Sequence, residues 1–405
     1  MATQNRDLST LRQAFVSSLE VGANTTVPVY SAPQNKTAYA KKIIVTNNTA
    51  SSATFDISLH ENKYMPGGNL FVVVANSTTA ASSTDGVTWT LRTMSIAKSF
   101  SQVAYGNKIF ATVAGNSTSA AYSTDGISWT TTTLPIATAW ASVTYGNGTF
   151  VAVSGTDSAN AATTSTDGIT WTARTIILPH NKSWFSVTYG NGTFVAVSAS
   201  SSTSATTSTD GITWTAATLP LASSWKLITY GNGTFVALTN GSTSAASSTN
   251  GVTWTLRTMP SSANWISATY GNGTFVALTN GSTSAASSID GITWTLRTLP
   301  TAISWKEITY GNNIFFAIAD GPTTTAASST DGITWTTRTM PVSTNWSSIA
   351  YPQRSDFSND NYLYKSTTLA ANTTQSISYE VVVPPTHEIR VRSSVPVQVT
   401  INGEV

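Results

Sequence analysis

The sequence contains no cysteine, so neither disulfide bonds nor thiolate-ligated metal sites are available to the protein. Charged residues make up only 9% of the 405 residues, and the formal net charge at pH 7 is +2. The 20 basic residues form no run or stripe, which disfavours binding to nucleic acid or to an anionic membrane surface. No apolar run is long enough to span a membrane, and the first residues lack the apolar core of a signal peptide. We therefore expect a protein made in the cytoplasm without membrane insertion.

What the sequence does contain is a repeat. Between about residues 70 and 351, a unit of about 40 residues occurs seven times, and each copy has a turn such as STDGITW that ends in tryptophan. The turn tryptophans are Trp89, Trp129, Trp171, Trp214, Trp254, Trp294 and Trp335. A repeat of this length with several short strand-like segments is typical of a β-propeller, with one blade per repeat.

The fourth unit, residues 184–220, illustrates one blade. WFSVTYG alternates and ends at Gly-Asn-Gly, TFVAVSAS follows, SATTST is a third segment, and ITWTAATL comes after an Asp-Gly pair. Asn-Gly and Asp-Gly favour tight hairpin turns because glycine adopts positive φ without steric cost. The unit therefore predicts four antiparallel strands.

The ends of the repeat predict how the ring closes. The first unit begins at its second strand, residues 70–75, and lacks the strand that precedes it in every other unit. The last unit stops after that strand, at residues 346–351. These fragments complement each other, so we expect them to pair and to close a seven-bladed ring.

The flanks at residues 26–64 and 358–405 consist of further strand-like segments. Neither flank alone has enough strands to bury two faces, but together they make a plausible β-sandwich. The predicted fold is therefore all-β, with a seven-bladed propeller at 65–357 inserted into a discontinuous sandwich domain. Residues 1–25 are expected to form an N-terminal arm, either extended or a short helix, or a disordered tail.

The flanks resemble a known group of proteins. Residues 30–59, residues 362–394 and the C-terminal VTINGEV resemble the small β-sandwich of tailed-bacteriophage virion proteins of the decoration or fibre type. The repeat is similar to the Asp-box repeats of sialidase-like propellers, Ser-x-Asp-x-Gly-x-Thr-Trp. Here the Asp directly precedes the Gly, as in Asp125-Gly126, and one copy has Asn250 instead.

The propeller offers little for catalysis. Glu307 is its only glutamate, and the repeated arginines and turn aspartates are spread around the ring by the repeat instead of converging. The non-repeated acids Asp157, Asp320 and Asp356 could in principle form a site, but solvated loop carboxylates are the simpler interpretation. His60, His180 and His387 are isolated and lack ligand spacing. We therefore expect no enzyme activity, no metal and no cofactor.

A second aromatic series leaves two interpretations open. Phe100 and six tryptophans stand at the start of the predicted inner strand of each blade. If they ring the mouth of a central channel, their faces could stack on sugars; alternatively, they pack between blades. The candidate glycan-binding residues are Trp140, Trp184, Trp225, Trp265, Trp305 and Trp346.

We predict a structural protein on the exposed surface of a bacteriophage virion, made in the host cytoplasm. It would be an appendage, either a capsid decoration or part of a tail, neck or baseplate fibre, that attaches to host-surface glycans through many copies. The sandwich and the N-terminal arm would contact other virion proteins, and a homo-oligomer is expected. The alternatives are a carbohydrate-processing enzyme of sialidase-like type, disfavoured by the missing acids, and a cellular protein-binding scaffold, disfavoured by the virion-like flanks.

Overall fold

The structure is a computed structural model that describes residues 70–156, 162–174 and 182–352 in full, and beyond them the backbone of the flanking strands. The regular elements of these residues are all β-strands. The described residues therefore contain no helix that could cross a membrane. The chain divides into a propeller unit, residues 65–353, and a flanking unit, residues 1–64 and 354–405. The corresponding predicted borders lie at 64/65 and 357/358.

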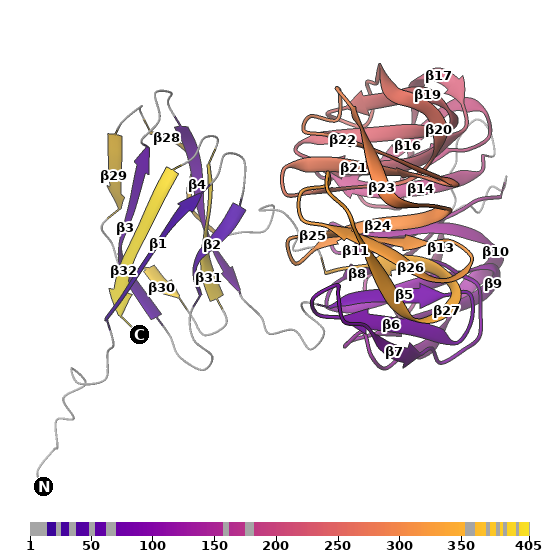
Figure 1. Cartoon of the computed structure of the whole chain (residues 1–405), viewed down its shortest axis with the longest axis horizontal. Helices are drawn as coiled ribbons and strands as arrows, with labels where there is room; N and C mark the ends of the chain where they lie inside the picture. Colours follow the sequence, from indigo (N-terminus) through magenta and orange to yellow (C-terminus); the bar gives the residue numbers. More distant parts are fainter. Residues whose placement is uncertain are drawn as a thin grey trace, which may run out of the picture. The chain divides into compact units, whose positions relative to one another are not determined.

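The strands of the propeller unit are shown in Figure 1, where they are numbered in sequence order. They are β5 Phe71–Ala75, β6 Thr79–Ser83, β7 Thr90–Thr93, β8 Phe100–Gly106, β9 Ile109–Ser123, β10 Thr130–Gly146, β11 Thr149–Ser154, β12 Ala162–Ser165, β13 Thr172–Arg174, β14 Trp184–Gly190, β15 Thr193–Ser198, β16 Ser202–Ser208, β17 Thr215–Ser223, β18 Trp225–Gly231, β19 Thr234–Ser248, β20 Thr255–Gly271, β21 Thr274–Thr279, β22 Ser282–Ser288, β23 Thr295–Ile303, β24 Trp305–Gly311, β25 Ile314–Ala319, β26 Pro322–Ser329 and β27 Thr336–Ala350.

One blade consists of β14, β15, β16 and β17, which form a four-stranded antiparallel sheet in chain order. The turn from β14 to β15 has φ of 46° at Asn191 and 75° at Gly192. Two consecutive positive φ values define the type I′ turn that matches the twist of a hairpin, and Asn-Gly is the pair that best tolerates it. The four strands predicted for residues 184–220 are present.

Some strands are longer because they belong to two blades. β10 pairs with β9 between Thr130 and Ala139, with an irregularity after Thr133, and with β11 through Trp140–Gly146. Its first half is thus the last strand of one blade, and its second half is the first strand of the next. β20 and β27 behave in the same way, so the propeller sheets contain four, six or seven strands.

The two ends of the propeller unit meet in one sheet. β27 pairs with β26 along its first half and with β5 along its second, where Trp346 lies opposite Ala75 and Ala350 opposite Val72. The predicted pairing of residues 346–351 with residues 70–75 is therefore confirmed. One blade is consequently built from chain segments about 270 residues apart in the sequence.

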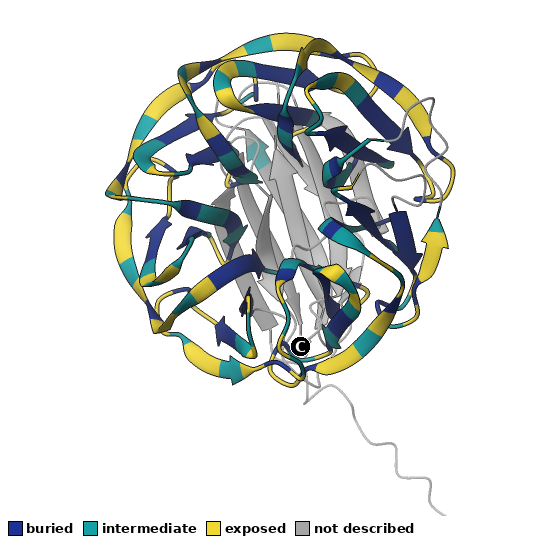
Figure 2. Ribbon diagram, turned by 90° about the vertical axis from the view of Figure 1, so that its right-hand side faces the viewer, coloured by how far each residue is buried: buried dark blue, intermediate teal, exposed yellow. Residues whose placement is uncertain are grey.

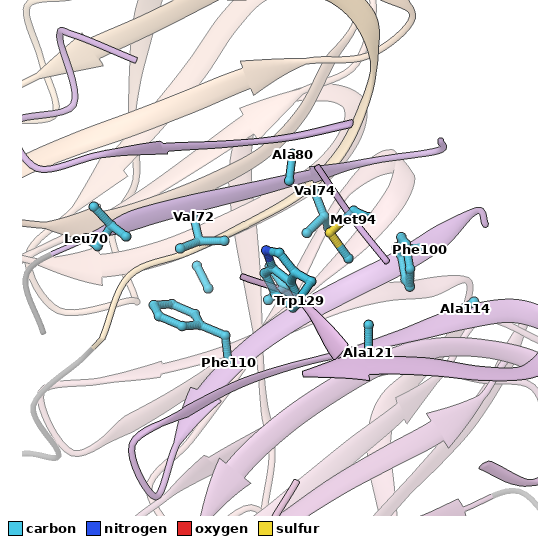
Figure 3. Close-up of a cluster of buried hydrophobic side chains, with 12 residues drawn as sticks. Leu70, Val72, Val74, Ala80, Met94, Phe100, Phe110, Ala114, Ala121 and Trp129 are labelled. Atoms are coloured by element: carbon cyan, nitrogen blue, oxygen red, sulfur yellow. The ribbon is translucent and has the colours of Figure 1, made fainter. Parts of the chain in front are cut away.

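The hydrophobic core lies between neighbouring blades. In one cluster, Val72 and Val74 of β5 and Met94 pack against Phe110 of β9 and against Trp129, the tryptophan of the next turn motif (Figure 3). Burying such large side chains is worth several kcal/mol each, because truncating a buried aromatic residue typically costs about 3–5 kcal/mol. Figure 2 shows the outcome: buried strands lie toward the centre and exposed ones form the rim.

Each tryptophan turn is stabilised by the same hydrogen bonds. In the first copy, the Gly86 N–H donates to Ser83 Oγ at 2.8 Å, and the N–H groups of Val87 and Thr88 donate to Asp85 Oδ1 at 2.8 Å. Gly86 has φ of 68°. The serine hydroxyl and one carboxylate oxygen of the motif are thus used within its own turn.

A second set of hydrogen bonds links these turns to the neighbouring blade. The asparagine of the Tyr-Gly-Asn turn of one blade donates from its side chain to the main-chain oxygen of a threonine. This threonine belongs to the tryptophan turn of the neighbouring blade. The pairs are Asn107 with Thr166, Asn147 with Thr209, Asn191 with Thr249, Asn272 with Thr330 and Asn312 with Thr84, at 3.1–3.4 Å. We call this side of the propeller the Asp-turn end.

The flanking unit contains nine described strands in two antiparallel sheets. They are β1 Ala14–Val21, β2 Thr26–Ser31, β3 Ala38–Asn47, β4 Ala53–Glu61, β28 Asn361–Leu369, β29 Thr373–Ile377, β30 Val381–Val383, β31 His387–Ser393 and β32 Val397–Glu404. One sheet has the order β1-β32-β3-β29, with β30 also pairing with β3, and the other has the order β2-β31-β4-β28. In both paths, strands from the N-terminal and C-terminal flanks alternate.

Part of the segment predicted as an N-terminal arm is a strand. Ala14–Val21 is a strand that pairs with β32 over its whole length, from Ala14 opposite Glu404 to Val21 opposite Val397. Of the three predicted forms of this segment, extended, helical or disordered, residues 14–21 adopt the extended one. Residues 1–13 lie outside the described residues.

The turn carboxylates make stability depend on acid pH. Hydrogen bonds from the N–H groups of Thr88 and Val87 lower the pKa of Asp85 from 3.8 to about 2. A carboxyl group with a lowered pKa stabilises the folded state above its ordinary pKa, and this contribution is lost as the pH falls toward about 2. In Asp85→Asn the amide oxygen can keep both bonds, as Asn250 does in the fifth copy at 2.9 Å, but it cannot titrate.

We therefore expect wild-type protein to lose stability relative to Asp85→Asn as the pH falls from 5 to 2. The measurement is the free energy of unfolding in denaturant at several pH values. Asn250→Asp is the matched control and should acquire an acid dependence of the same sign. Parallel pH profiles for all three proteins would contradict this account of the turn.

Candidate functional site

The first strand of each blade lies on the inside of the ring. In β10, β20 and β27 this is the second half of the strand, and in β8, β14, β18 and β24 it is the whole strand. Each of these inner strands contacts the next in the order β8, β10, β14, β18, β20, β24, β27, and β27 in turn contacts β8. Every inner strand begins with Phe100 or a tryptophan, so we call this side of the propeller the tryptophan end.

The six candidate glycan-binding tryptophans are buried. Trp140 and Trp184 are 1% exposed, and Trp225, Trp265, Trp305 and Trp346 are 0% exposed. A sugar must reach the face of a ring to stack on it, so the prediction that these residues bind glycan is wrong. The other interpretation, packing between blades, is correct.

Local contacts explain why these tryptophans turn inward. Trp225 packs against Val195 and Val197 of the preceding blade. Its indole N–H donates to the main-chain oxygen of Leu221 at 3.0 Å, which ties the loop between two blades to the inner strand. Trp140 makes the equivalent bond to Ile136 at 3.3 Å. Each of these two tryptophans therefore packs between two blades and holds the connection between them.

The residue two positions after each of these aromatics links neighbouring blades. An inner strand pairs on one side only, so its other edge presents backbone N–H groups without a strand partner. At one position, a side-chain oxygen of the preceding blade accepts this N–H. The pairs, with the accepting side chain first and the donating N–H second, are Ser348 with Val103, Gln102 with Val143, Ser142 with Val187, Ser186 with Ile228, Ser267 with Ile308 and Glu307 with Ile349, at 2.7–3.2 Å.

The seventh position of this series is Leu227, which has no oxygen to offer. Its side chain is 5% exposed and packs with Met259 and Trp265 instead. At this junction, apolar contact replaces the hydrogen bond. We call the six hydrogen-bonding residues the edge links.

The two longest edge links flank the blade that closes the ring. Glu307 of β24 accepts the Ile349 N–H at 2.7 Å and also accepts from Gln102 Nε2 of β8 at 3.1 Å. Gln102 Oε1 in turn accepts from Ser142 Oγ at 2.7 Å. These contacts pass across β27, so they connect the blades on both sides of the closing sheet.

Glu307 is therefore occupied by structural contacts. Burial raises the pKa of its carboxyl group, while hydrogen bonds from Ser348, Ile349 and Gln102 act in the opposite direction. The side chain is partly exposed although its carboxyl group is surrounded by protein atoms. A carboxylate with three donors already directed at it is poorly suited to nucleophilic or general acid chemistry.

The other predicted acids and histidines give no assembled site. Asp320 forms an ion pair with Lys306 at 3.8 Å, whereas Asp157, Asp356 and His180 lie outside the described residues. His60 and His387 belong to β4 and β31, where only the backbone is described. Among the residues described, no group of three acidic or histidine side chains could hold a metal ion.

The repeated arginines also serve their own blades. Arg92 Nε donates to Ser82 Oγ at 2.9 Å, and Arg257 Nε donates to Ser247 Oγ at 2.8 Å, in each case across two paired strands. The same contact recurs at Arg174, Arg297 and Arg338. They do not converge, as the sequence predicted.

A cluster that the sequence analysis did not single out lies at the tryptophan end. Lys226 Nζ stands 3.3 Å from the centre of the Phe185 ring. Burial and the charge of Lys306 lower the pKa of Lys226. The lysines could be seen in the sequence: in a chain with few charged residues, they occupy the position directly after the tryptophan in two of the seven repeats.

Comparisons with known proteins agree with the architecture. Residues 132–264 match the family described as the DUF6242 beta propeller domain. No curated protein matches the sequence. Among solved structures, virginiamycin B lyase from Staphylococcus aureus aligns over 84% of this chain and 99% of its own, with TM-score 0.55 and 12% identity. A streptogramin B lyase structure aligns over 71% of this chain and 88% of its own, with TM-score 0.53 and 12% identity.

YCF48 from Cyanidioschyzon merolae is a more distant neighbour, with TM-score 0.48, 17% identity, and coverage of 70% of this chain and 96% of its own. Similarity to the lyases at 12% identity shows the fold alone. The propeller unit is a β-propeller.

The edge links predict a specific loss of stability. Ser186→Ala removes the acceptor of the Ile228 N–H, and we expect a cost of about 1 kcal/mol in the free energy of unfolding. Ser101→Ala is the matched control, because Ser101 lies on the inner strand β8, directly before the edge link Gln102, and is not an edge link itself. The cost of this substitution in the free energy of unfolding should stay below about 0.5 kcal/mol. Equal losses for both variants, measured by denaturant unfolding, would rule out the proposed role of the links.

Glu307 predicts a second pH dependence, of opposite sign to that of Asp85. Because its folded pKa is raised above the ordinary 4.5, its contribution to stability is complete below that pH and declines as the pH rises through the folded pKa. Glu307→Gln cannot ionise but can still accept the Ile349 N–H. The stability of wild type minus that of Glu307→Gln should therefore decrease between pH 4 and pH 8. A difference that is constant with pH would contradict the raised pKa.

Proposed function

We propose that this protein is a non-enzymatic structural protein of a bacteriophage virion, in which a seven-bladed propeller is displayed by a β-sandwich built from the two flanks. The observation that carries the proposal is the strand order of the flanking unit. Strands from the two flanks alternate in both sheets, so neither flank forms its sheets without the other. The propeller is thus an insertion into a small β domain whose sequence resembles virion proteins.

Seven blades are supported by two series of contacts. The six edge links and the apolar junction at Leu227 follow one another through seven inner strands and return to the first. At the Asp-turn end, the bond from Asn312 to Thr84 crosses the same closure. The last blade is therefore tied to the first at both ends of the ring.

The sandwich is supported by contacts between the two flanking sheets. β1 contacts β2, and β30 contacts β31. The insertion is supported by the register of β4 and β28, in which Leu59 lies opposite Asn361. Glu61, the last residue of β4, is therefore close to the first residue of β28, and a short turn could join them directly.

The absence of catalysis is supported by the way polar groups are used. Turn aspartates, repeated arginines and Glu307 are all engaged in hydrogen bonds within the propeller. The virginiamycin B lyase likeness rests on the fold alone and does not favour an enzyme. We propose that the protein lies on the exposed surface of the particle, as a homo-oligomer bound to other virion proteins, and contributes to host attachment.

The test of this proposal uses purified virions. Particles from the source phage, isolated on a density gradient, should contain the chain at many copies by quantitative mass spectrometry. Electron microscopy with an antibody against the propeller should label the outside of the particle. A chain that stays in the unassembled fraction of the lysate would overturn the virion assignment.

A shortened chain tests the insertion separately. Replacing residues 62–360 by a short Gly/Ser turn should convert β4 and β28 into a hairpin and leave a cooperatively folded β domain that still enters particles. The matched control also removes β28, residues 361–369, and should not fold. If the shorter deletion fails to fold as well, the insertion model is wrong whatever the location of the protein.

A further inference from the structure

One repeat position of the inner strand, unlike the structural positions described above, is a candidate ligand site. It directly follows the aromatic residue at the tryptophan end, and in ring order it is occupied by Ser101, Ala141, Phe185, Lys226, Ile266, Lys306 and Ser347. The five positions without a lysine carry two serines, one alanine, one isoleucine and one phenylalanine, none of them charged. The fold therefore does not require a cation here, yet two of the seven positions carry one.

The first of these cations is held in an unfavourable setting for a charge. Lys226 is half-buried, and its ammonium group stands 3.3 Å from the centre of the Phe185 ring on the neighbouring inner strand, β14. A cation over an aromatic face gains up to about 2 kcal/mol when it is desolvated. No carboxylate of the described residues forms an ion pair with Lys226, so the ring compensates only part of its lost hydration.

The second cation adds repulsion to the first. Lys306 belongs to β24, with only β20 between it and β18, and its charge acts on Lys226. Asp320 neutralises Lys306 in part through the ion pair at 3.8 Å. Both side chains remain accessible to solvent: Lys306 is 35% exposed and Asp320 is 42% exposed. Lys226 is thus stabilised by the Phe185 ring but opposed by the charge of Lys306, and unfavourable charge arrangements of this kind concentrate at sites that bind ligands.

We propose that Lys226 and Lys306 bind the anionic groups of an acidic polysaccharide at the tryptophan end of the propeller. Because they stand on different blades, the two ammonium groups suit a ligand with repeated negative charges. Lys98 and Lys182 each precede an inner strand by two residues at the same end and add to the positive potential. Serine and threonine hydroxyls of the surrounding loops can accept and donate hydrogen bonds to sugar hydroxyls.

Nucleic acid is the competing polyanion. Sequence-independent binding of single strands combines a basic groove with several exposed aromatic rings. Here the ring tryptophans are buried, and Phe185 is covered on one face by Lys226. A carbohydrate with carboxylate or phosphate groups needs only the charges and hydroxyls that are present.

The experiment measures binding of the full-length protein to immobilised polymers at low ionic strength. Polygalacturonate tests carboxylate groups, phosphorylated dextran tests phosphate groups, neutral dextran is the uncharged control, and oligo(dT) tests nucleic acid. We expect wild-type protein to bind one or both acidic polysaccharides but not neutral dextran. The double variant Lys226→Gln/Lys306→Gln should weaken that binding at least tenfold without changing the thermal unfolding temperature by more than a few degrees.

Lys108→Gln is the matched control, because it removes one lysine at the opposite end of β8, in the turn to β9. Its binding should stay within twofold of wild type. No binding of either acidic polysaccharide, an equal loss in Lys108→Gln, or tighter binding of oligo(dT) would each overturn the proposal. The biological setting of this site, display on a virion, rests on the proposed function, but the two proposals are tested separately. Failure in this assay does not contradict the virion location, and absence of the protein from particles does not contradict the binding result.

Discussion

The free edge of the inner strand is the constraint on which this ring depends. Each inner strand pairs with one neighbour only, and an unsatisfied backbone N–H in a packed environment costs stability. Neighbouring blades supply oxygens at 2.7–3.2 Å, mostly from serine. A serine is short, so the blades must approach closely, and the buried tryptophan two residues earlier holds them at that distance. Tryptophan burial and the edge links therefore depend on each other. The same burial makes the tryptophans inaccessible to a ligand.

Ring closure makes a special demand on the same device. The closing sheet joins β27 and β5, which lie at opposite ends of the propeller sequence, so its formation costs more chain entropy than that of any other blade. The longer links, Gln102 and Glu307, stand on either side of this sheet and touch each other across it. Their reach ties three successive blades together where the chain itself does not. The only glutamate of the propeller sequence thus has a structural role in the closure of the ring.

Much of this architecture could be predicted from the sequence, because turns and strand alternation are local. The Asn-Gly and Asp-Gly turns fixed the hairpins, and the complementary ends of the repeat predicted the pairing of Trp346 with the strand ending at Ala75. What failed were questions of orientation. Spacing alone does not tell whether Trp225 points to a solvent-filled opening or between blades, nor whether Phe15 and Leu19 belong to a helix or to β1. The edge links were invisible because they join residues that become neighbours only when the ring forms.

Repetition gives this chain an internal standard for separating structure from function. Where most copies agree, a shared packing or hydrogen-bonding task accounts for the residue, as with the turn aspartate in six copies and the arginine in five. Where a copy departs, either a local replacement compensates, as with Leu227, or the fold bears a cost. Lys226 and Lys306 fall in the second class. In a protein with only 9% charged residues, few other side chains are available to neutralise them, so their field extends to whatever approaches this end of the ring. That is why we base the proposed ligand site on the departures from the repeat and not on the repeat itself.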